Sequence, residues 1–502
     1  MIDKNNSTDH YIIALPPPCT NADVHMGHLT GVYIIGDIYA KFQKDTGANV
    51  LTIGGADQNN TYTERKSIQE KMDFYETGEY YAEKIKNSLS LANVHLDAYI
   101  ETSKAIHHET VNEIFTILEK NHLIEQTECY QLYCEQCQKF LCDSQLSGLC
   151  AICNNPCDGG VCENCYSPIF NIKIMNPLHN ECHSVPTVKK TVLLTLNISK
   201  LKSKLEKMIS SSNWDQRLKY KYLEYLSREK CEKIPLTCHY KNGIKISSLP
   251  NETQTFTIWF EAIWSFFTGL KAVYQKSIND VVQMINDKQC KIVAWMGQDS
   301  EFYYAIAFSL VCLGIGINYI PHNISVQRFV KLLGSKFSSS RGHTLFLQEL
   351  LNKYHPDVIR LYSLSVIKSY FENGNNFIIE ELEKLNHQFL LFREKMIHFN
   401  YPQAIESFDN TKIKDPVLIE YQSLMNRFEF YKIYDMALSR MRTIILQGLP
   451  QKKDFGDFLI TLIILKPIIP LTVGEIMLKM KEIIPTASFC NPESLHMDLP
   501  LY

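Results

Sequence analysis

Three Cys-x2-Cys pairs stand close together in this sequence, and they constrain the fold of their segment more than any other local feature. They are Cys134 with Cys137, Cys150 with Cys153, and Cys162 with Cys165. Of the 16 cysteines in the chain, eight lie between positions 134 and 165. The N-terminus is polar and lacks a secretory pattern, so we expect a cytoplasmic protein, in which reduced thiols bind metals before they form disulfides. The segment is therefore predicted to be an inserted metal-binding module.

The spacing of these pairs predicts one or two structural zinc sites. The clearest set supplies four thiolates from two tight turns, an arrangement that suits tetrahedral zinc: Cys150, Cys153, Cys162 and Cys165. The pair of Cys134 and Cys137 predicts a second site, which Cys142 or Cys157 would complete, with its last two ligands unassigned. Four thiolates leave no open coordination position, so the metal would stabilise the fold and take no part in chemistry. The alternative is a segment of free thiols.

Length and charge set wider limits. The 502 residues exceed what one hydrophobic core usually serves, so about three domains are expected. A net charge of -3 excludes a generally basic protein, and any nucleic acid would be held by local patches. The most apolar late stretch, Phe458 to Leu465, is too short to span a bilayer, so no membrane partner is expected.

The beginning of the chain has the pattern of an open α/β sheet. A strand is predicted at Tyr11 to Leu15, a helix at Leu29 to Thr46 and a second strand at Asn49 to Ile53, which together form a βαβ unit. Helical patterns fill the region from Glu64 to about Leu123, and a strand signal returns at Lys291 to Trp295. Ligands of such sheets bind beyond the carboxyl ends of the strands.

The last part of the chain, from about Phe377, is predicted to be an α-helical bundle. Its apolar residues first alternate three and four positions apart, which places them on one face of a helix: Leu382, Leu385, Phe389, Phe392 and Met396.

The four residues His25-Met26-Gly27-His28 are the first candidate for chemistry. They lie where the first predicted helix begins, and free N–H groups together with the helix dipole favour anions there. Gly27 lets a nucleotide approach the backbone, and each histidine can donate a hydrogen bond to a phosphate oxygen. The alternative is a pair of histidines that only cap or pack the helix start.

Two further motifs give this one a context. Gly54-Gly55-Ala56-Asp57 follows the second strand, and Lys336-Phe337-Ser338-Ser339-Ser340 lies much later. In order and type, the first and last of these motifs resemble the His-Ile-Gly-His and Lys-Met-Ser-Lys-Ser signatures of class I aminoacyl-tRNA synthetases. The resemblance implies that His25 and His28 stabilise the α-phosphate of ATP during adenylate formation, and that Lys336 lies over the β- and γ-phosphates.

Within that class the chain resembles the methionyl family. The distance between the two signatures is too short for the editing domain of valyl enzymes, and the methionyl insert carries Cys-x2-Cys zinc knuckles as this one does. Further similar segments extend over nearly the whole chain: Trp259 to Ala262, Met296 to Asp299, Tyr354 to Arg360 and Leu465 to Pro470.

The resemblance implies an α/β fold, a Rossmann-type parallel sheet with a zinc-knuckle connective-peptide insert and a C-terminal α-helical bundle. The implied domains are two catalytic halves (1–117 and 241–330), the insert (118–240, with its knuckles at about 130–166), a stem-contact region (331–376) and the bundle (377–502). The implied reaction is ATP-dependent activation of methionine and its transfer to tRNA, with Mg²⁺ accompanying ATP.

The resemblance also implies two sets of site residues. The ATP set is His25, Gly27, His28, Gly297, Asp299, Lys336, Ser338, Ser339 and Arg341. The amino-acid set is Pro17, Cys19, Asp57, Trp259, Ala262, Tyr303 and Tyr304. Asp57 would bind the substrate's α-ammonium, although a turn aspartate is the commoner fate of such a residue. Trp259 and Trp264, amid several phenylalanines, would wall a side-chain pocket or simply belong to the core.

The sequence departs from the family in its pocket and its bundle. Ser339 replaces the second lysine of the later signature, Gln58 and Asn59 replace Glu-His, and Cys19 and Tyr304 replace a tyrosine and a histidine. The anticodon-reading Asn and Arg of the family fall on Lys395 and Phe399, and all four tryptophans precede the bundle. Two alternatives therefore stay open: a paralogue that gives its adenylate to a non-tRNA acceptor, and a catalytically impaired tRNA-binding or regulatory homologue.

Overall fold

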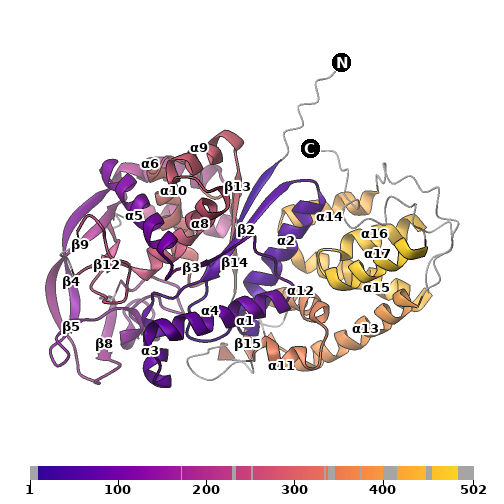
Figure 1. Ribbon diagram of the computed structural model, residues 1–502, viewed down its shortest axis with the longest axis horizontal. Coiled ribbons are helices and arrows are strands. Elements are labelled where there is room, and N and C mark those ends of the chain that lie inside the picture. Colours follow the sequence, from indigo (N-terminus) through magenta and orange to yellow (C-terminus); the bar gives the residue numbers. More distant parts are fainter. Residues whose placement is uncertain are drawn as a thin grey trace, which may run out of the picture.

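A central sheet separates the two ends of this molecule (Figure 1). The computed structural model describes residues 9–170, 172–228, 233–249, 253–328, 330–332, 335–336, 345–372, 376–398, 415–447 and 455–483. The cysteine-rich insert lies on one side of the sheet and the C-terminal helices lie on the other.

The central sheet has five parallel strands in the order β14-β13-β1-β2-β3. Their bounds are β1 His10–Ala14, β2 Asn49–Ala56, β3 Ala98–Glu101, β13 Lys291–Gly297 and β14 Asn323–Gln327. The βαβ start and the return of the sheet at Lys291 are thus confirmed. The sequence does not predict the two edge strands: β3 is only four residues long and stands between helices α4 and α5, and β14 alternates weakly.

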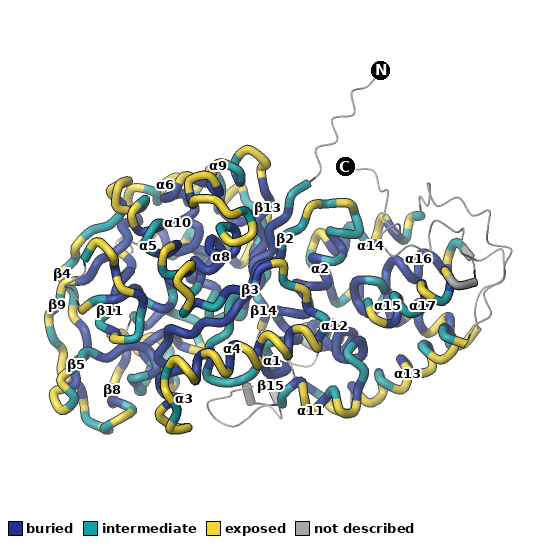
Figure 2. Tube along the Cα trace, viewed as in Figure 1, coloured by how far each residue is buried: buried dark blue, intermediate teal, exposed yellow. Residues whose placement is uncertain are grey.

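Both faces of the sheet are buried, which explains why its strands are apolar throughout. Ile13 and its neighbours on one face pack against α2 (Ile34–Asp45) in a core that continues into the bundle. Ile12 and Ala14 on the other face pack against α5 (Ala105–Lys120) and α8 (Ile258–Tyr274). The dark central strands in Figure 2 show this double burial.

The remaining helices of the sheet region surround the strands. Between β1 and α2 the chain forms α1 (Met26–His28) and a π-helical turn η1 (Leu29–Tyr33). The others are α3 Thr61–Glu70, α4 Phe74–Leu91, α9 Ile278–Lys288, the π-helical η3 Tyr303–Phe308, α10 Ser309–Gly314 and α11 Leu347–Leu351. Among the described helices, none combines the length and the apolar character needed to cross a bilayer.

The insert is built on a long antiparallel pair, β4 (Ile124–Cys134) and β9 (Thr187–Asn197), in a sheet ordered β10-β9-β4-β5. A second small sheet, ordered β7-β6-β8, carries Cys150 and Cys157. The other insert elements are β5 Lys139–Phe140, the 3-10 turn η2 Asp143–Gln145, β6 Leu146–Cys150, β7 Pro156–Asp158, β8 Ile174–His179, α6 Ser199–Ser211, α7 Gln216–Ser227 and β10 Lys233–Pro235. Two further small sheets complete the strands. One pairs β11 (Thr237–Cys238) with β12 (Thr255–Phe256), and the other places β15 (Lys331–Leu332) between β16 (Ser335–Lys336) and β17 (Asn376–Phe377).

The C-terminal region is helical, as predicted. Its helices are α12 Pro356–Glu372, α13 Ile379–Ile397, α14 Pro416–Asn426, α15 Phe430–Gln447, α16 Phe455–Leu465 and α17 Pro470–Ile483. The five apolar residues that predict α13 are all buried against the other helices.

A fully buried arginine on α12 joins this bundle to the sheet region. The Arg360 guanidinium donates to Asp37 on α2 at 2.7 Å. It also donates to four backbone carbonyls: Ala92, Asn93, Pro467 and Ile468. Burial raises the pKa of Asp37, but Lys41 and Arg360 outweigh it and hold that pKa below its ordinary value. The two late segments that resemble the methionyl family therefore meet at this residue.

Candidate active site and metal centres

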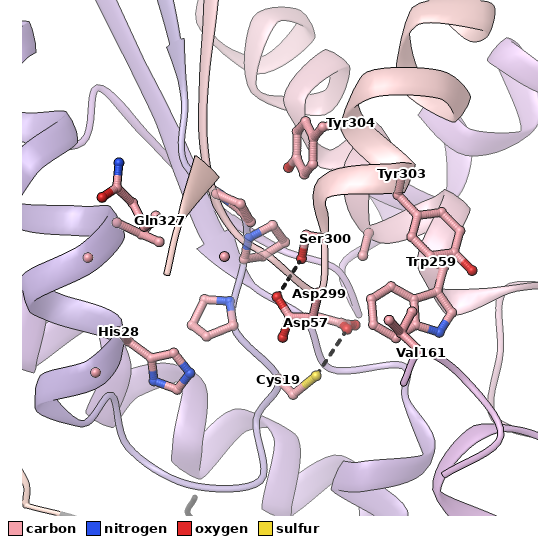
Figure 3. Close-up of a pocket in the computed structure, with 18 of the residues that line it drawn as sticks. Cys19, His28, Asp57, Val161, Trp259, Asp299, Ser300, Tyr303, Tyr304 and Gln327 are labelled. Atoms are coloured by element: carbon pink, nitrogen blue, oxygen red, sulfur yellow. Dashed lines mark hydrogen bonds between the residues drawn. The ribbon is translucent and has the colours of Figure 1, made fainter. Parts of the chain in front are cut away.

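A cavity of about 270 Å³ opens at the carboxyl ends of the central strands (Figure 3). It is lined by the loop after β1, the start of α1, the end of β2, the first turns of α8 and the loop after β13. Twelve residues of the predicted site sets line it: Pro17, Cys19, His25, Gly27, His28, Asp57, Trp259, Ala262, Gly297, Asp299, Tyr303 and Tyr304. The structure thus brings together residues that are nearly three hundred positions apart in the sequence, from Pro17 to Tyr304.

The two histidines of the first motif stand at the helix start. His25 caps α1, because its Nδ1 accepts from the His28 backbone N–H at 3.3 Å. The two imidazole rings stack with centroids 3.8 Å apart and planes within 8°. The Met26 N–H donates to the Leu345 carbonyl at 3.0 Å, which fixes the motif against the segment that follows the second signature. Both imidazoles therefore face the cavity as one preformed unit.

Asp57 follows β2 directly and is buried beneath the cavity. Its backbone N–H donates to Pro18 at 2.9 Å, and its Oδ2 accepts from the Cys19 thiol at 3.7 Å (Figure 3). Its Oδ1 has no hydrogen-bond partner among the described residues. Burial, and then the nearby Glu261, raise the pKa of Asp57 well above its ordinary value. A buried carboxylate oxygen without a partner is costly, and a cationic ligand would satisfy it.

A buried pair that the sequence does not predict lies below Asp57. His107 Nε2 is 2.7 Å from Glu261 Oε2, and its Nδ1 is 2.8 Å from the Thr268 hydroxyl. Burial raises the pKa of Glu261 to about 8 and lowers that of His107 to about 3. Burial thus favours the uncharged forms of both groups.

Gln58 and Asn59, which replace a Glu-His pair of the family, are both buried. Gln58 Oε1 accepts from the Ser103 hydroxyl at 2.9 Å, and Asn59 Nδ2 donates to the Thr102 carbonyl at 2.9 Å. These two residues therefore tie the end of β2 to the loop after β3, and neither of them lines the cavity.

Aromatic rings form one wall of the cavity. Trp259 and Tyr303 stack with centroids 4.8 Å apart and planes within 13°, and Tyr304 lies on the same helical segment (Figure 3). Trp264, by contrast, is fully buried in the core below the sheet. Of the two readings of this aromatic stretch, Trp259 therefore belongs to the pocket and Trp264 to the core.

Residues predicted to bind the nucleotide line the same cavity. Asp299 follows β13, and the Ser300 hydroxyl donates to it at 3.4 Å. Gln327, the last residue of β14, and Arg328 after it also line the cavity. The sequence does not predict them because β14 itself is not predicted. Of the second signature, Lys336 belongs to β16, whose side chains the structure does not describe, and Ser338, Ser339 and Arg341 lie outside the described residues.

The first predicted metal site is assembled as expected. Cys150, Cys153, Cys162 and Cys165 place their sulfur atoms within 4.8 Å of one another. The Cys150–Cys165 and Cys153–Cys162 sulfurs are 3.8 and 3.6 Å apart. Four sulfurs at 2.3 Å from one zinc lie about 3.8 Å from each other, so this geometry fits the ion. Val161 and Glu163, beside Cys162, line the cavity.

The second site has other ligands than predicted. Cys134 and Cys137 meet His179 and Cys182, with all four ligand atoms within 4.8 Å. The His179 Nδ1 lies 3.0 Å from the Cys182 sulfur and 3.6 Å from that of Cys137.

The assignment of Cys142 or Cys157 to this second site is wrong. Cys142 packs against Cys238 and Tyr240 instead, and Cys157 lies on β7. The His-x2-Cys spacing at 179–182 is a signal that could have revealed the true ligands. It lies beyond the cysteine-dense segment.

This chain is similar to known proteins in both its sequence and its fold. The family model described as "tRNA synthetases class I (M)" matches residues 11–391. The methionine–tRNA ligase of Borreliella afzelii is 27% identical over 435 residues, which are 83% of this chain and 59% of that protein. That of Chloroherpeton thalassium is 26% identical over 361 residues, 70% of this chain and 51% of that protein. The chain thus spans only about half to three fifths of the length of these relatives.

A solved structure shares the fold. The methionyl-tRNA synthetase of Mycobacterium tuberculosis bound by methionyl-adenylate superimposes with a TM-score of 0.66 at 14% sequence identity, covering 93% of this chain and 94% of that one. The similarity confirms the predicted α/β fold with an insert and a helical C-terminal region.

Proposed function

This chain belongs to the family described as "tRNA synthetases class I (M)", and from that premise we propose that it activates methionine with ATP and transfers it to tRNA. The observation that carries the proposal is the placement of two stacked histidines and the partnerless oxygen of Asp57 on one cavity. A phosphate and an ammonium group would thus be bound in one cavity, as the reaction of an amino acid with a nucleotide requires. The relatives described above are methionine–tRNA ligases and the solved structure is a methionyl-tRNA synthetase, which favours methionine as the amino acid for this chain.

Different residues of the cavity would bind different parts of the amino acid. The α-ammonium would pair with Asp57, and this pairing would lower the raised pKa of that carboxyl and keep it ionised. The apolar side chain would lie between Cys19 and the stacked Trp259 and Tyr303. The substrate carboxylate would then face the α-phosphate beside His25 and His28.

The histidines would act by electrostatic stabilisation. When the carboxylate attacks the α-phosphorus and pyrophosphate leaves, negative charge grows on the phosphate oxygens. Hydrogen-bond donors already aimed at that position need no reorganisation, which makes them effective in a closed site. Asp299 and Gly297 would hold the ribose end, and Lys336, with Mg²⁺, the pyrophosphate end.

The cysteine sites would hold one zinc ion each. When bound, the metal supplies folding energy to the insert and no reactive group, because protein ligands fill its four positions. We further propose the domain division given by the sequence, with the insert at 118–240 and the bundle from 377. The two alternatives, a non-tRNA acceptor and an inactive homologue, find no support in the comparisons.

The test is amino-acid-dependent exchange of pyrophosphate into ATP, run with each standard amino acid and followed by charging of total tRNA. We expect exchange with methionine alone and methionylation of tRNA. His25→Ala should lower the exchange rate about 100- to 1000-fold, because it removes one preorganised donor. His387→Ala, on α13 outside the cavity, is the matched control and should leave exchange within about twofold of the unchanged protein. Absence of exchange with every amino acid would refute the proposal.

A further inference from the structure

A short turn of the insert reaches the helices that build the amino-acid end of the cavity. This turn, η2, makes one side-chain or backbone contact from each of its three residues. Asp143 Oδ1 accepts from the Trp259 indole N–H at 3.1 Å. The Ser144 N–H donates to the Thr61 hydroxyl at 3.0 Å, and Gln145 Nε2 donates to Glu64 at 2.9 Å. The turn thus bridges α8, which carries Trp259, and α3, which starts just after Asp57.

The backbone of Asp143 is arranged for this contact. Asp143 is buried and has a φ of 44°, in the left-handed region that aspartate and asparagine tolerate better than most side chains. Its carbonyl accepts from the Gly159 N–H at 2.9 Å, which closes the turn onto the neighbouring strand of the insert. The carboxylate is therefore held in one direction, toward the indole.

Gly160 encloses the same hydrogen bond from the other side. A Cβ at this position would lie 2.8 Å from Asp143 Oδ1 and 3.0 Å from Trp259 Nε1. Both distances are shorter than or at the limit of normal contacts, so any side chain there must push the carboxylate and the indole apart. Only glycine leaves the pair intact.

The wall that the indole forms borders a cavity on each side. A second cavity, of about 110 Å³, lies behind it, and Trp259 and Tyr303 line both cavities. Asp143 and Gly160 line only the second one. Without a fixed partner, the Trp259 ring has space to turn backward and leave the substrate side of the wall.

We propose that Asp143 is a positioning residue that holds the stacked Trp259 and Tyr303 as a fixed wall against the apolar side chain of the amino acid. The inference rests on the proposed function, since it assigns that wall to amino-acid binding. Asp143 touches no substrate and acts only through Trp259. The insert thereby sets the affinity for the amino acid but not for ATP.

The kinetic test compares Asp143→Ala with Asp143→Asn in methionine-dependent exchange. We expect the alanine variant to raise KM for methionine about tenfold, with KM for ATP and kcat within about twofold, because it removes one hydrogen bond to a charged acceptor. Asparagine keeps an acceptor oxygen and tolerates the positive φ, so its KM should stay within about threefold of the unchanged protein. Gly160→Ala leaves Asp143 in place and should raise KM about as much as Asp143→Ala, which keeps the test valid if the alanine variant at 143 fails to fold.

A double-mutant cycle with Trp259→Phe shows whether Asp143 acts through the indole. In the Trp259→Phe background, Asp143→Ala should change KM by less than about twofold, because phenylalanine has no N–H to position. An equal rise of KM in both backgrounds would overturn the proposal. A parallel change of kcat, of KM for ATP and of thermal stability would overturn it as well, since that pattern indicates a purely structural role.

A spectroscopic readout separates this proposal from the proposed function. The near-ultraviolet circular dichroism of Trp259, taken as the difference between the unchanged protein and Trp259→Phe, should weaken strongly in Asp143→Ala without any substrate. Trp214→Phe is the matched control, because its indole donates to the Pro321 carbonyl at 2.8 Å and does not line the cavity. If exchange fails with all amino acids, the proposed function fails while this signal still reports on Asp143. An unchanged Trp259 signal refutes the positioning role.

Discussion

The two cysteine sites of the insert look alike in their ligands and differ in what they connect. The first takes all four ligands from one short segment, and its second pair encloses Glu163, which lines the cavity. The second takes one pair from the end of β4 and the other from the end of β8 and the link to β9. The first site therefore fixes a loop that lines the cavity, whereas the second joins two segments that are more than 40 positions apart in the sequence.

Two sites with similar ligands can therefore affect different properties of the protein. Loss of the first site should be felt mainly in substrate binding, because the loop of Val161 and Glu163 would lose its fixed position. Loss of the second should be felt mainly in stability, because it would release a much longer stretch of chain.

Removal of both metals should have the largest effect. We expect about two zinc ions per chain by elemental analysis, and at least a 100-fold loss of exchange activity after chelation, because metal binding free energy is folding free energy in sites of this kind. Activity should return when zinc is added back, which serves as the control. A metal-free chain with full activity and an unchanged circular dichroism spectrum would contradict the assignment of both sites.

Serine substitutions should separate the two sites. Cys162→Ser is expected to raise KM for methionine about tenfold, whereas Cys182→Ser should raise it less than about threefold and lower the melting temperature more, on the loop argument above. Each variant should lose about one zinc ion per chain. Steady-state exchange and thermal melts measure the contrast. Equal effects of the two variants on KM would remove the distinction between the sites.

The smallest effect is expected for an exchange of ligand type in the second site. His179→Cys keeps four ligands and should retain about two zinc ions per chain, with KM for methionine within about twofold of the unchanged protein. His179→Ala should lower the zinc content to about one, because three protein ligands bind structural zinc less well than four. Retention of both ions by the alanine variant would show that His179 is not a ligand.

The same contrast explains how much the sequence could predict. The four ligands of the first site are local, so their spacing alone identifies them, and the strand, loop and helix around His25 are equally local. His179 and Cys182 reach Cys134 only because β4 and β9 pair along their whole length. No local pattern encodes that pairing, and the ligand prediction failed there.

The other site residues that the sequence does not predict depend on contacts between distant parts of the chain. His107 and Glu261 stand on different helices, and their contact follows from the packing of α5 on α8. Gln327 enters the cavity from an edge strand too short and too weakly alternating to be recognised. Asp143 reads as an ordinary turn residue, and its contact with Trp259 appears only once the insert is folded onto the sheet. The predicted residues, by contrast, follow strand ends, where position in the sequence already determines position in space.

Arg360 connects the helical bundle firmly to the sheet region. Its guanidinium holds Asp37 on the helix that continues from His28, and it also holds the carbonyls between α16 and α17. A rotation of the bundle about this point would break charged hydrogen bonds in a buried interior, so bending of the molecule here would cost much free energy. The helical region and the helix that follows His25 and His28 are therefore expected to move together, so a displacement of the bundle would also displace these two histidines.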